Sequence, residues 1–296
     1  MKGCLLILTI ALMILEGCSG RNNSRKSSLP QTDSLNFSLP NVPGIINEPQ
    51  DKMDYLMEHF WDALSPKCYA AQVEGQFANF LWISEQVSLD KAEASLIKAY
   101  GKDPERILAL AEKYLYDPLS PYRNEDLFGK LAAKVGGERY EGIARRCALN
   151  AVGSKARDFS MVDRKGRDLR LYEIDAEFVL LFFSNPGCAS CKEIIEVLSR
   201  DELISQAVRD KHLKVLSMYI DEDLELWHEH LGDYPKEWIV AYDPLLELRN
   251  MDSYNIRAIP SVYLLDKDKT VLLKDAPEEK LIPRLRQELS LYYGKF

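Results

Sequence analysis

The sequence predicts an all-α unit followed by an α/β domain. Three observations support this organisation. Apolar residues recur at helical spacing from 50 to 152, short apolar runs alternate with helical segments from 153 to 296, and a polar segment without periodicity precedes both. The 296 residues are 46% hydrophobic and 28% charged, which suffices for two soluble domains with buried cores. The formal charge of −8 argues against a nucleic-acid partner.

Residues 1–17 have the pattern of a bacterial signal peptide. Lys2 precedes an apolar stretch, Leu5 to Leu15, that is too short to span a bilayer. The end of this segment, Leu-Glu-Gly followed by Cys18, resembles the lipobox of bacterial lipoproteins, where the chain is cut before a cysteine that becomes lipidated. The resemblance implies lipidation of Cys18 and a membrane-anchored protein of the cell envelope that faces the periplasm, with the outer membrane favoured. Ordinary secretion or an uncleaved anchor is the alternative.

Residues 18–49 are rich in Ser, Asn, Pro and Arg, which predicts a flexible tether between the lipid and the folded domains. Residues 50–152 predict five or six helices, because stretches such as "DKMDYLMEHFWDAL" place apolar residues three and four positions apart. This helical unit has no recognisable catalytic constellation. We expect its aromatic residues to form a core: Phe60, Trp61, Phe77, Phe80 and Trp82.

The helical unit also contains two cysteines, Cys68 and Cys147. In the oxidising cell envelope, cysteines are usually paired or reactive. These two either form a disulfide within the unit or remain as unpaired buried thiols, because the sequence does not show whether they approach one another.

From residue 153 the sequence predicts alternating strands and helices. A hairpin with a Lys-Gly turn comes first, and the run Phe178 to Phe183 is a continuous apolar strand. A helix should follow from Cys188 to about Leu198. Further along, the pattern predicts strands at 212–221 and 238–243, helices at 224–231 and 245–255, a hairpin formed by 261–266 and 270–275, and a final helix at 277–292. We expect a mainly parallel sheet to which the last hairpin adds antiparallel edges.

A pair of cysteines, Cys188 and Cys191, lies at the predicted start of a helix. We expect no metal site, because zinc needs two more ligands and the chain has no second Cys-x-x-Cys motif. His228 and His230 are two residues apart and do not share a helix face. A purely structural disulfide is also disfavoured, since closing so short a loop contributes little stability. The pair is therefore predicted to be a reactive dithiol, with Cys188 as the nucleophile at the positive end of the helix dipole.

Residues 155–296 resemble the thioredoxin-fold domain of the TlpA-like envelope thiol–disulfide oxidoreductases. Three stretches carry the resemblance: "ARDFSMVDRKGRDLRL" is similar to the entry hairpin of that group, "VLLFFSNPGCASCK" to its strand, Cys-x-x-Cys motif and helix, and "YNIRAIPSVYLLD" to the segment that carries its cis-proline. The whole chain also resembles bacterial lipoproteins in which an uncharacterised helical domain precedes a thioredoxin-like module.

The resemblance implies a set of site residues and partners. Cys188 and Cys191 would form a redox-active disulfide that needs no added cofactor, with the cis-proline Pro260 packed beside the two sulfurs. Gly187 and Ile259 would contact the substrate. The substrates would be protein disulfides or dithiols, and an upstream donor in the envelope would supply electrons. Reduction is favoured over oxidation, and a binding or adaptor lipoprotein with little catalytic activity is the alternative function.

One feature departs from the thioredoxin pattern. Thioredoxin has a buried aspartate on the strand before the motif, and Phe182 occupies the matching position here. Proton transfer from the second cysteine would then use water or another carboxylate. The candidates are Glu177, Asp221 and Glu193, and the sequence does not choose between them.

Overall fold

The computed structural model describes residues 37–250 and 253–294, which belong to one compact unit. The predicted signal peptide, the lipidation site Cys18 and the predicted tether up to residue 36 lie outside the described residues. In the part of the chain that the structure describes, no helix is both long enough and apolar enough to cross a membrane.

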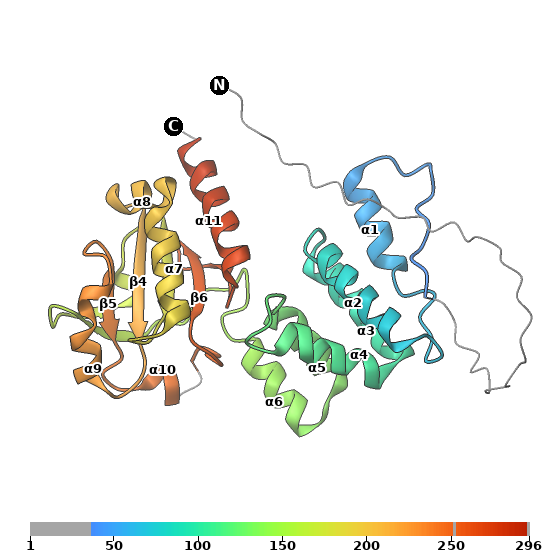
Figure 1. The fold of residues 1–296 in the computed structure, drawn as a ribbon, viewed down its shortest axis with the longest axis horizontal. Helices are drawn as coiled ribbons and strands as arrows, with labels where there is room; N and C mark the ends of the chain where they lie inside the picture. Colours follow the sequence, from blue (N-terminus) through green and yellow to red (C-terminus); the bar gives the residue numbers. More distant parts are fainter. Residues whose placement is uncertain (1–36, 251–252, 295–296) are drawn as a thin grey trace, which may run out of the picture. The chain divides into compact units, whose positions relative to one another are not determined.

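The N-terminal half of the described chain is helical, as predicted (Figure 1). Its elements are α1 (Pro49–His59), α2 (Ala70–Ser84), α3 (Leu89–Lys102), α4 (Pro104–Ala111), a π-helical turn (Glu112–Tyr116), α5 (Glu125–Val135) and α6 (Gly137–Cys147). We call this part the helical domain. Its aromatic core confirms four of the five predicted residues, which are buried and in ring contact: Phe60, Trp61, Phe77 and Phe80.

The prediction for the fifth aromatic residue is wrong, because 59% of Trp82 is exposed. Successive residues of a helix are about 100° apart around its axis. Trp82 therefore lies on the side of α2 opposite Val73, while Val73, Phe77 and Phe80 face the core. Although Trp82 is aromatic like Phe77 and Phe80, it does not lie on the same face of α2 as they do.

The two cysteines of the helical domain are free and buried, so the alternative of unpaired thiols holds and the disulfide does not form. Cys147 ends α6 and packs directly against Gly129 of α5. A Cβ atom added at Gly129 would lie only 2.6 Å from the Cβ of Cys147. Position 129 therefore has to be glycine for α5 and α6 to pack this closely.

Replacing Gly129 with alanine should lower the free energy of unfolding by about 1–3 kcal/mol, because the new methyl group overpacks the α5–α6 contact. The matched control is Gly75→Ala, also within a helix, where an added Cβ meets nothing within 4 Å. That change should raise stability by up to about 1 kcal/mol through helix propensity. Urea denaturation of both variants measures the two effects, and equal shifts of the same sign would contradict the packing argument.

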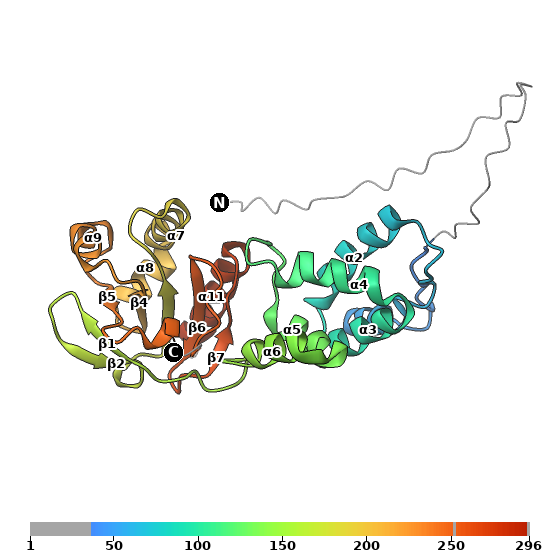
Figure 2. The ribbon, with the colours of Figure 1, turned by 90° about the horizontal axis from the view of Figure 1, so that it is seen from below.

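The C-terminal half is a seven-stranded sheet covered by helices (Figures 1 and 2). Its strands are β1 (Ser160–Asp163), β2 (Asp168–Arg170), β3 (Phe178–Phe183), β4 (Leu213–Tyr219), β5 (Ile239–Tyr242), β6 (Ser261–Asp266) and β7 (Val271–Leu273), in the order β2-β1-β5-β4-β3-β6-β7. Its helices are α7 (Ala189–Arg200), α8 (Glu202–Arg209), α9 (Leu224–Glu229), α10 (Glu247–Asn250) and α11 (Glu278–Tyr293). We call this part the sheet domain.

The prediction of a mainly parallel sheet is wrong. Only β3 with β4 and β4 with β5 pair in parallel, and the other neighbouring strands of the described sheet are antiparallel. Parallel neighbours need a crossover connection, and helices supply one on each side of β4. The β1–β2 and β6–β7 hairpins join the two edges of that parallel centre in the antiparallel sense. Helix α8 was not predicted from the sequence, and the helix predicted at 245–255 is longer than α10, which spans Glu247–Asn250.

The central strand β3 is buried on both faces. Phe178, Leu180 and Phe182 pack into one hydrophobic cluster with residues of α7, α8 and α11. Val179, Leu181 and Phe183 pack into a second cluster on the other face. A strand held on both sides in this way fixes the position of the chain that leaves its carboxyl end, where the cysteine motif begins.

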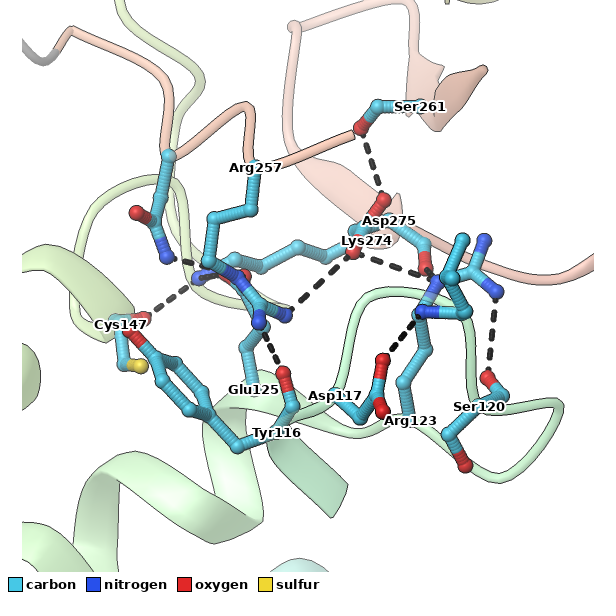
Figure 3. A network of polar contacts seen from close by, with 12 residues as sticks. Tyr116, Asp117, Ser120, Arg123, Glu125, Cys147, Arg257, Ser261, Lys274 and Asp275 are labelled. Atoms are coloured by element: carbon cyan, nitrogen blue, oxygen red, sulfur yellow. Dashed lines mark hydrogen bonds and ion pairs between the residues drawn. The ribbon is translucent and has the colours of Figure 1, made fainter. Parts of the chain in front are cut away.

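The two domains meet at a buried charged cluster formed by Glu125 of α5, Arg257 and Lys274 (Figure 3). Glu125 accepts hydrogen bonds from Asn255 at 2.9 Å and from Arg257 at 2.6 Å. The Arg257 guanidinium also lies over the ring of Tyr116, 4.1 Å from its centroid, and donates to its carbonyl oxygen. These contacts join the helical domain to the segment that leads into Pro260.

Candidate active site

The cysteine motif follows β3 and begins α7. The backbone N–H of Cys188 donates to the carbonyl oxygen of Asn185 at 3.3 Å, which closes the turn between strand and helix. Gly187 in this turn has a φ of +70°, in the left-handed region that favours glycine. Cys188 is the N-cap of α7, and its sulfur accepts a hydrogen bond from the backbone N–H of Cys191 at 3.1 Å.

Cys188 and Cys191 form a disulfide, with their Cα atoms 5.2 Å apart. Cys188 is partly exposed, whereas only 2% of Cys191 is exposed. An incoming group therefore reaches the sulfur of Cys188 before that of Cys191. The N–H groups and the dipole at the start of α7 favour negative charge there, which suits Cys188 as the attacking thiolate of the reduced pair.

A pocket of about 430 Å³ opens beside the disulfide. It is lined by both cysteines and by the turn that precedes them, with Lys192, Asp233 and Tyr234 completing its wall. The exposed amine of Lys192 adds positive charge beside the position of a thiolate. The pocket lets a substrate approach the motif from the side on which Cys188 is accessible.

A cluster of three buried hydroxyl groups adjoins this pocket through Tyr234, which lines it. Ser184 Oγ is 2.7 Å from Ser217 Oγ of β4 and 3.1 Å from the hydroxyl oxygen of Tyr234. This cluster was not predicted from the sequence. The signal was two serines, one at the end of a strand and one inside another, in runs that are otherwise apolar. Buried hydroxyls carry protons and orient one another, so the cluster provides a polar floor next to the motif.

The three candidate carboxylates for proton transfer lie at different positions relative to the cysteines. Asp221 lies beyond β4 and accepts a hydrogen bond from the Asn185 side chain at 2.8 Å, which places its carboxylate against the motif's turn. Its other oxygen pairs with Arg249 at 3.0 Å. Glu193 is exposed on α7, two residues after Cys191. Glu177 precedes β3 at the end opposite the motif, roughly 20 Å along the strand, and is not brought near the cysteines.

The segment that the resemblance assigned to the cis-proline has that conformation, because the Ile259–Pro260 peptide bond is cis. Ile259 packs against the same hydrophobic cluster as Cys188 and Cys191. Pro260 and Ile259 line a pocket with Ser190, which lies between the two cysteines. The cysteine motif and the proline segment, far apart in the sequence, thus lie at one site.

Comparisons with family models match the two halves of the chain separately. A thioredoxin-like family model matches residues 175–271, which contain the cysteines and the cis-proline. A domain family of unknown function, DUF5106, matches residues 17–138. The second match assigns no activity to the helical domain.

Known proteins resemble the chain in both sequence and structure. The crystal structure of a thioredoxin-like protein from Bacteroides caccae has a TM-score of 0.75 and 34% sequence identity, and it covers 86% of this chain and 98% of that one. The thiol-disulfide oxidoreductase ResA of Bacillus cereus is 24% identical over 149 residues, which are 50% of this chain and 83% of ResA. ResA of Geobacillus kaustophilus is 25% identical over 144 residues, 48% of this chain and 78% of that protein. The chain therefore belongs to the thioredoxin-like proteins and has the thioredoxin fold.

Proposed function

We propose that this protein reduces disulfide bonds of other proteins in the bacterial cell envelope, with Cys188 and Cys191 as its redox pair and no added cofactor. The observation that supports this function best is the asymmetry of the pair. Cys188 is accessible at the start of α7, while Cys191 is buried behind it and bonded to it. A thiol pair arranged in this way can attack an external disulfide and then close on itself.

The reaction starts from the reduced pair and moves two electrons to the substrate. The Cys188 thiolate attacks one sulfur of the substrate disulfide, forms a mixed disulfide and releases the other substrate sulfur as a thiolate. Cys191 loses its proton and attacks Cys188, which forms the Cys188–Cys191 disulfide and releases the second substrate thiolate. A dithiol donor of the envelope then reduces the pair by the reverse exchange.

We infer that the carboxylate of Asp221 accepts the proton that Cys191 loses. Its hydrogen bond to Asn185 fixes it beside the turn that precedes the two cysteines. Glu193 is exposed on α7 and lines the pocket next to Pro260. The three buried hydroxyls next to the motif offer further donors and acceptors around the departing proton.

The location of the protein rests on the sequence before residue 37. The lipobox-like end of the signal segment supports lipidation of Cys18, and the polar segment after it supports a tether that holds the two domains away from the membrane surface. We place the protein on the periplasmic side of the envelope, anchored in the outer membrane. This setting supplies protein disulfides as substrates.

A trapping experiment tests the proposal. Cys191→Ser leaves Cys188 able to form a mixed disulfide but unable to release it, so cells that produce this variant should accumulate covalent complexes with envelope proteins in the membrane fraction. In Cys18→Ala/Cys191→Ser the complexes should leave the membrane fraction, and Cys188→Ser/Cys191→Ser should trap nothing. Failure of Cys191→Ser to trap any protein, combined with non-covalent recovery of partners by all variants, would support the adaptor function instead.

A further inference from the structure

A second pocket lies on the other side of the motif helix, next to Pro260. Its volume is about 260 Å³, and its walls come from four segments. The start of α7, the Ile259–Pro260 segment and the start of α11 belong to the sheet domain. The fourth wall is the loop of residues 117–124, which belongs to the helical domain. A site beside the reacting disulfide is therefore built by both domains.

The 117–124 loop is held in place from both sides. Within the helical domain, Asn124 N–H donates to the carbonyl oxygen of Leu115 at 2.9 Å and the Ser120 hydroxyl donates to that of Tyr114 at 2.7 Å. Across the interface, Arg123 Nε donates to the backbone oxygen of Asp275 at 2.8 Å and lies 3.3 Å from its carboxylate (Figure 3). The loop is therefore a fixed part of the pocket.

Asp275 connects this loop to the residue that follows the cis-proline. Its carboxylate accepts a hydrogen bond from the hydroxyl of Ser261 at 2.8 Å, while the same side chain pairs with Arg123 (Figure 3). Asp275 is buried, and desolvation raises the pKa of its carboxyl group. The loop and the cis-proline segment thus share one buried anchor.

An apolar side chain stands out from this fixed loop. Leu119 lines the pocket, together with Ile259 and Pro260, yet 84% of it is exposed. Single exposed apolar residues are common on protein surfaces. Leu119 differs because its loop is held in place by hydrogen bonds next to the cysteine motif, so its side chain can contact a bound substrate. Pro118 and Pro121 on either side of it add rigid apolar surface.

The remaining charge of the pocket is negative. Glu193 of α7 and Glu278 and Glu279 of α11 line it, whereas its cation, Arg123, is already paired with Asp275. Burial raises the pKa of Glu278, and the charges of Glu279 and Glu193 raise it further, which shows that the carboxylates are close enough to repel one another. A basic side chain placed here would relieve that repulsion. We call this pocket the acidic groove.

We propose that the acidic groove binds the stretch of a substrate protein next to its disulfide, and that it selects stretches with an apolar residue and a lysine or arginine. The inference rests on the proposed function and assigns the helical domain a share of substrate selection. The apolar residue would contact Leu119 and Ile259, and the basic residue would face Glu193 and Glu278. The groove shares the first turn of α7 with the cysteine pair, since Ser190 lines it, so a bound stretch would contact the helix turn that carries the reacting cysteine.

Two peptides test the charge selection. Both contain one disulfide and the same apolar residue beside it, and they differ by lysine or glutamate at the next position. The reduced wild-type protein should reduce the lysine peptide with a kcat/KM roughly fivefold higher, and high salt should abolish the difference, because the ion pairs are partly exposed. Reduction of both peptides with equal kcat/KM would overturn the inference but leave the proposed function intact. Reduction of neither would overturn the proposed function.

The triple variant Glu193→Gln/Glu278→Gln/Glu279→Gln should bring the ratio of the two kcat/KM values close to one. The matched control, Glu105→Gln/Glu138→Gln/Glu141→Gln, changes the net charge equally at exposed positions of the helical domain and should keep the wild-type ratio. The ratio separates selection from catalysis: an equal slowing of both peptides, with the ratio unchanged, would overturn the groove as a selector.

The apolar contact has its own pair of variants. Leu119→Ser should raise KM for the lysine peptide roughly fivefold and leave kcat unchanged, because the lost contact contributes to binding. Ile45→Ser is the matched control, since Ile45 is an apolar residue of the helical domain that is 86% exposed and does not line the groove. Equal KM values for the two variants would show that Leu119 takes no part in substrate binding.

Discussion

Replacing Cys188 with serine should lower the reduction of insulin disulfides at least about a hundredfold, to the rate of the chemical reductant alone. A serine hydroxyl stays protonated at neutral pH and does not attack a disulfide. Cys191 cannot take over, because only 2% of it is exposed behind the first turn of α7. The measurement is the rate at which reduced insulin chains precipitate in the presence of dithiothreitol.

The control for the loss of activity in Cys188→Ser is a variant without the other two thiols that the structure describes. Cys68 and Cys147 are free but buried, and burial raises the pKa of Cys147 to about 12, so this residue stays a thiol at neutral pH. Cys68→Ala/Cys147→Ala should therefore keep the wild-type rate. Full activity of Cys188→Ser, or loss of activity in the folded Cys68→Ala/Cys147→Ala variant, would show that the reacting sulfur is elsewhere.

The part of the site that is contiguous in the sequence could be predicted from it. An apolar strand, a turn and a helix follow one another from Phe178 to Arg200, and this order fixes Cys188 at the start of the helix. Asp221 follows a strand parallel to β3, so the carboxyl ends of both strands bring it to the motif's turn. Local pattern was enough for the two cysteines, whereas Asp221 was only one of three candidate carboxylates until the structure placed it beside the turn.

Features that depend on strand register or domain contact could not be predicted. The hydroxyl cluster exists because β3 and β4 pair in the register that sets Phe182 opposite Ser217. The 117–124 loop reaches the site through Arg123 and Asp275, which are 152 residues apart. The antiparallel edge formed by the last hairpin was predicted, whereas the antiparallel pairing of β1 with β5 was not, because the sequence does not show which strand the first hairpin joins.

Replacing Lys274 with methionine should cause the largest loss of stability, about 3–5 kcal/mol in the free energy of unfolding. Only 2% of the Lys274 side chain is exposed. Its amine lies 3.4 Å from Glu125 and donates to the carbonyl oxygen of Cys147 (Figure 3). It also lies 3.3 Å from Asp126 of α5 and donates to the carbonyl oxygen of Leu149. Without the amine, two buried acceptors lose a donor and the carboxylates lose a cation, at a cost that methionine packing does not offset.

The matched control is Lys130→Met, also an ion pair of α5. The amine of Lys130 lies 3.3 Å from Glu93, but 49% of its side chain is exposed, so its loss should change the free energy of unfolding by less than about 1 kcal/mol. Urea denaturation followed by circular dichroism compares the two variants. Both changes remove an amine that lies 3.3–3.4 Å from a carboxylate, but only the Lys274 amine is buried and also donates to two backbone carbonyl oxygens. Equal losses would mean that the buried cluster does not hold the helical domain against the sheet domain. A far larger loss for Lys274→Met would show that the buried cluster stabilises the contact between the helical domain and the sheet domain.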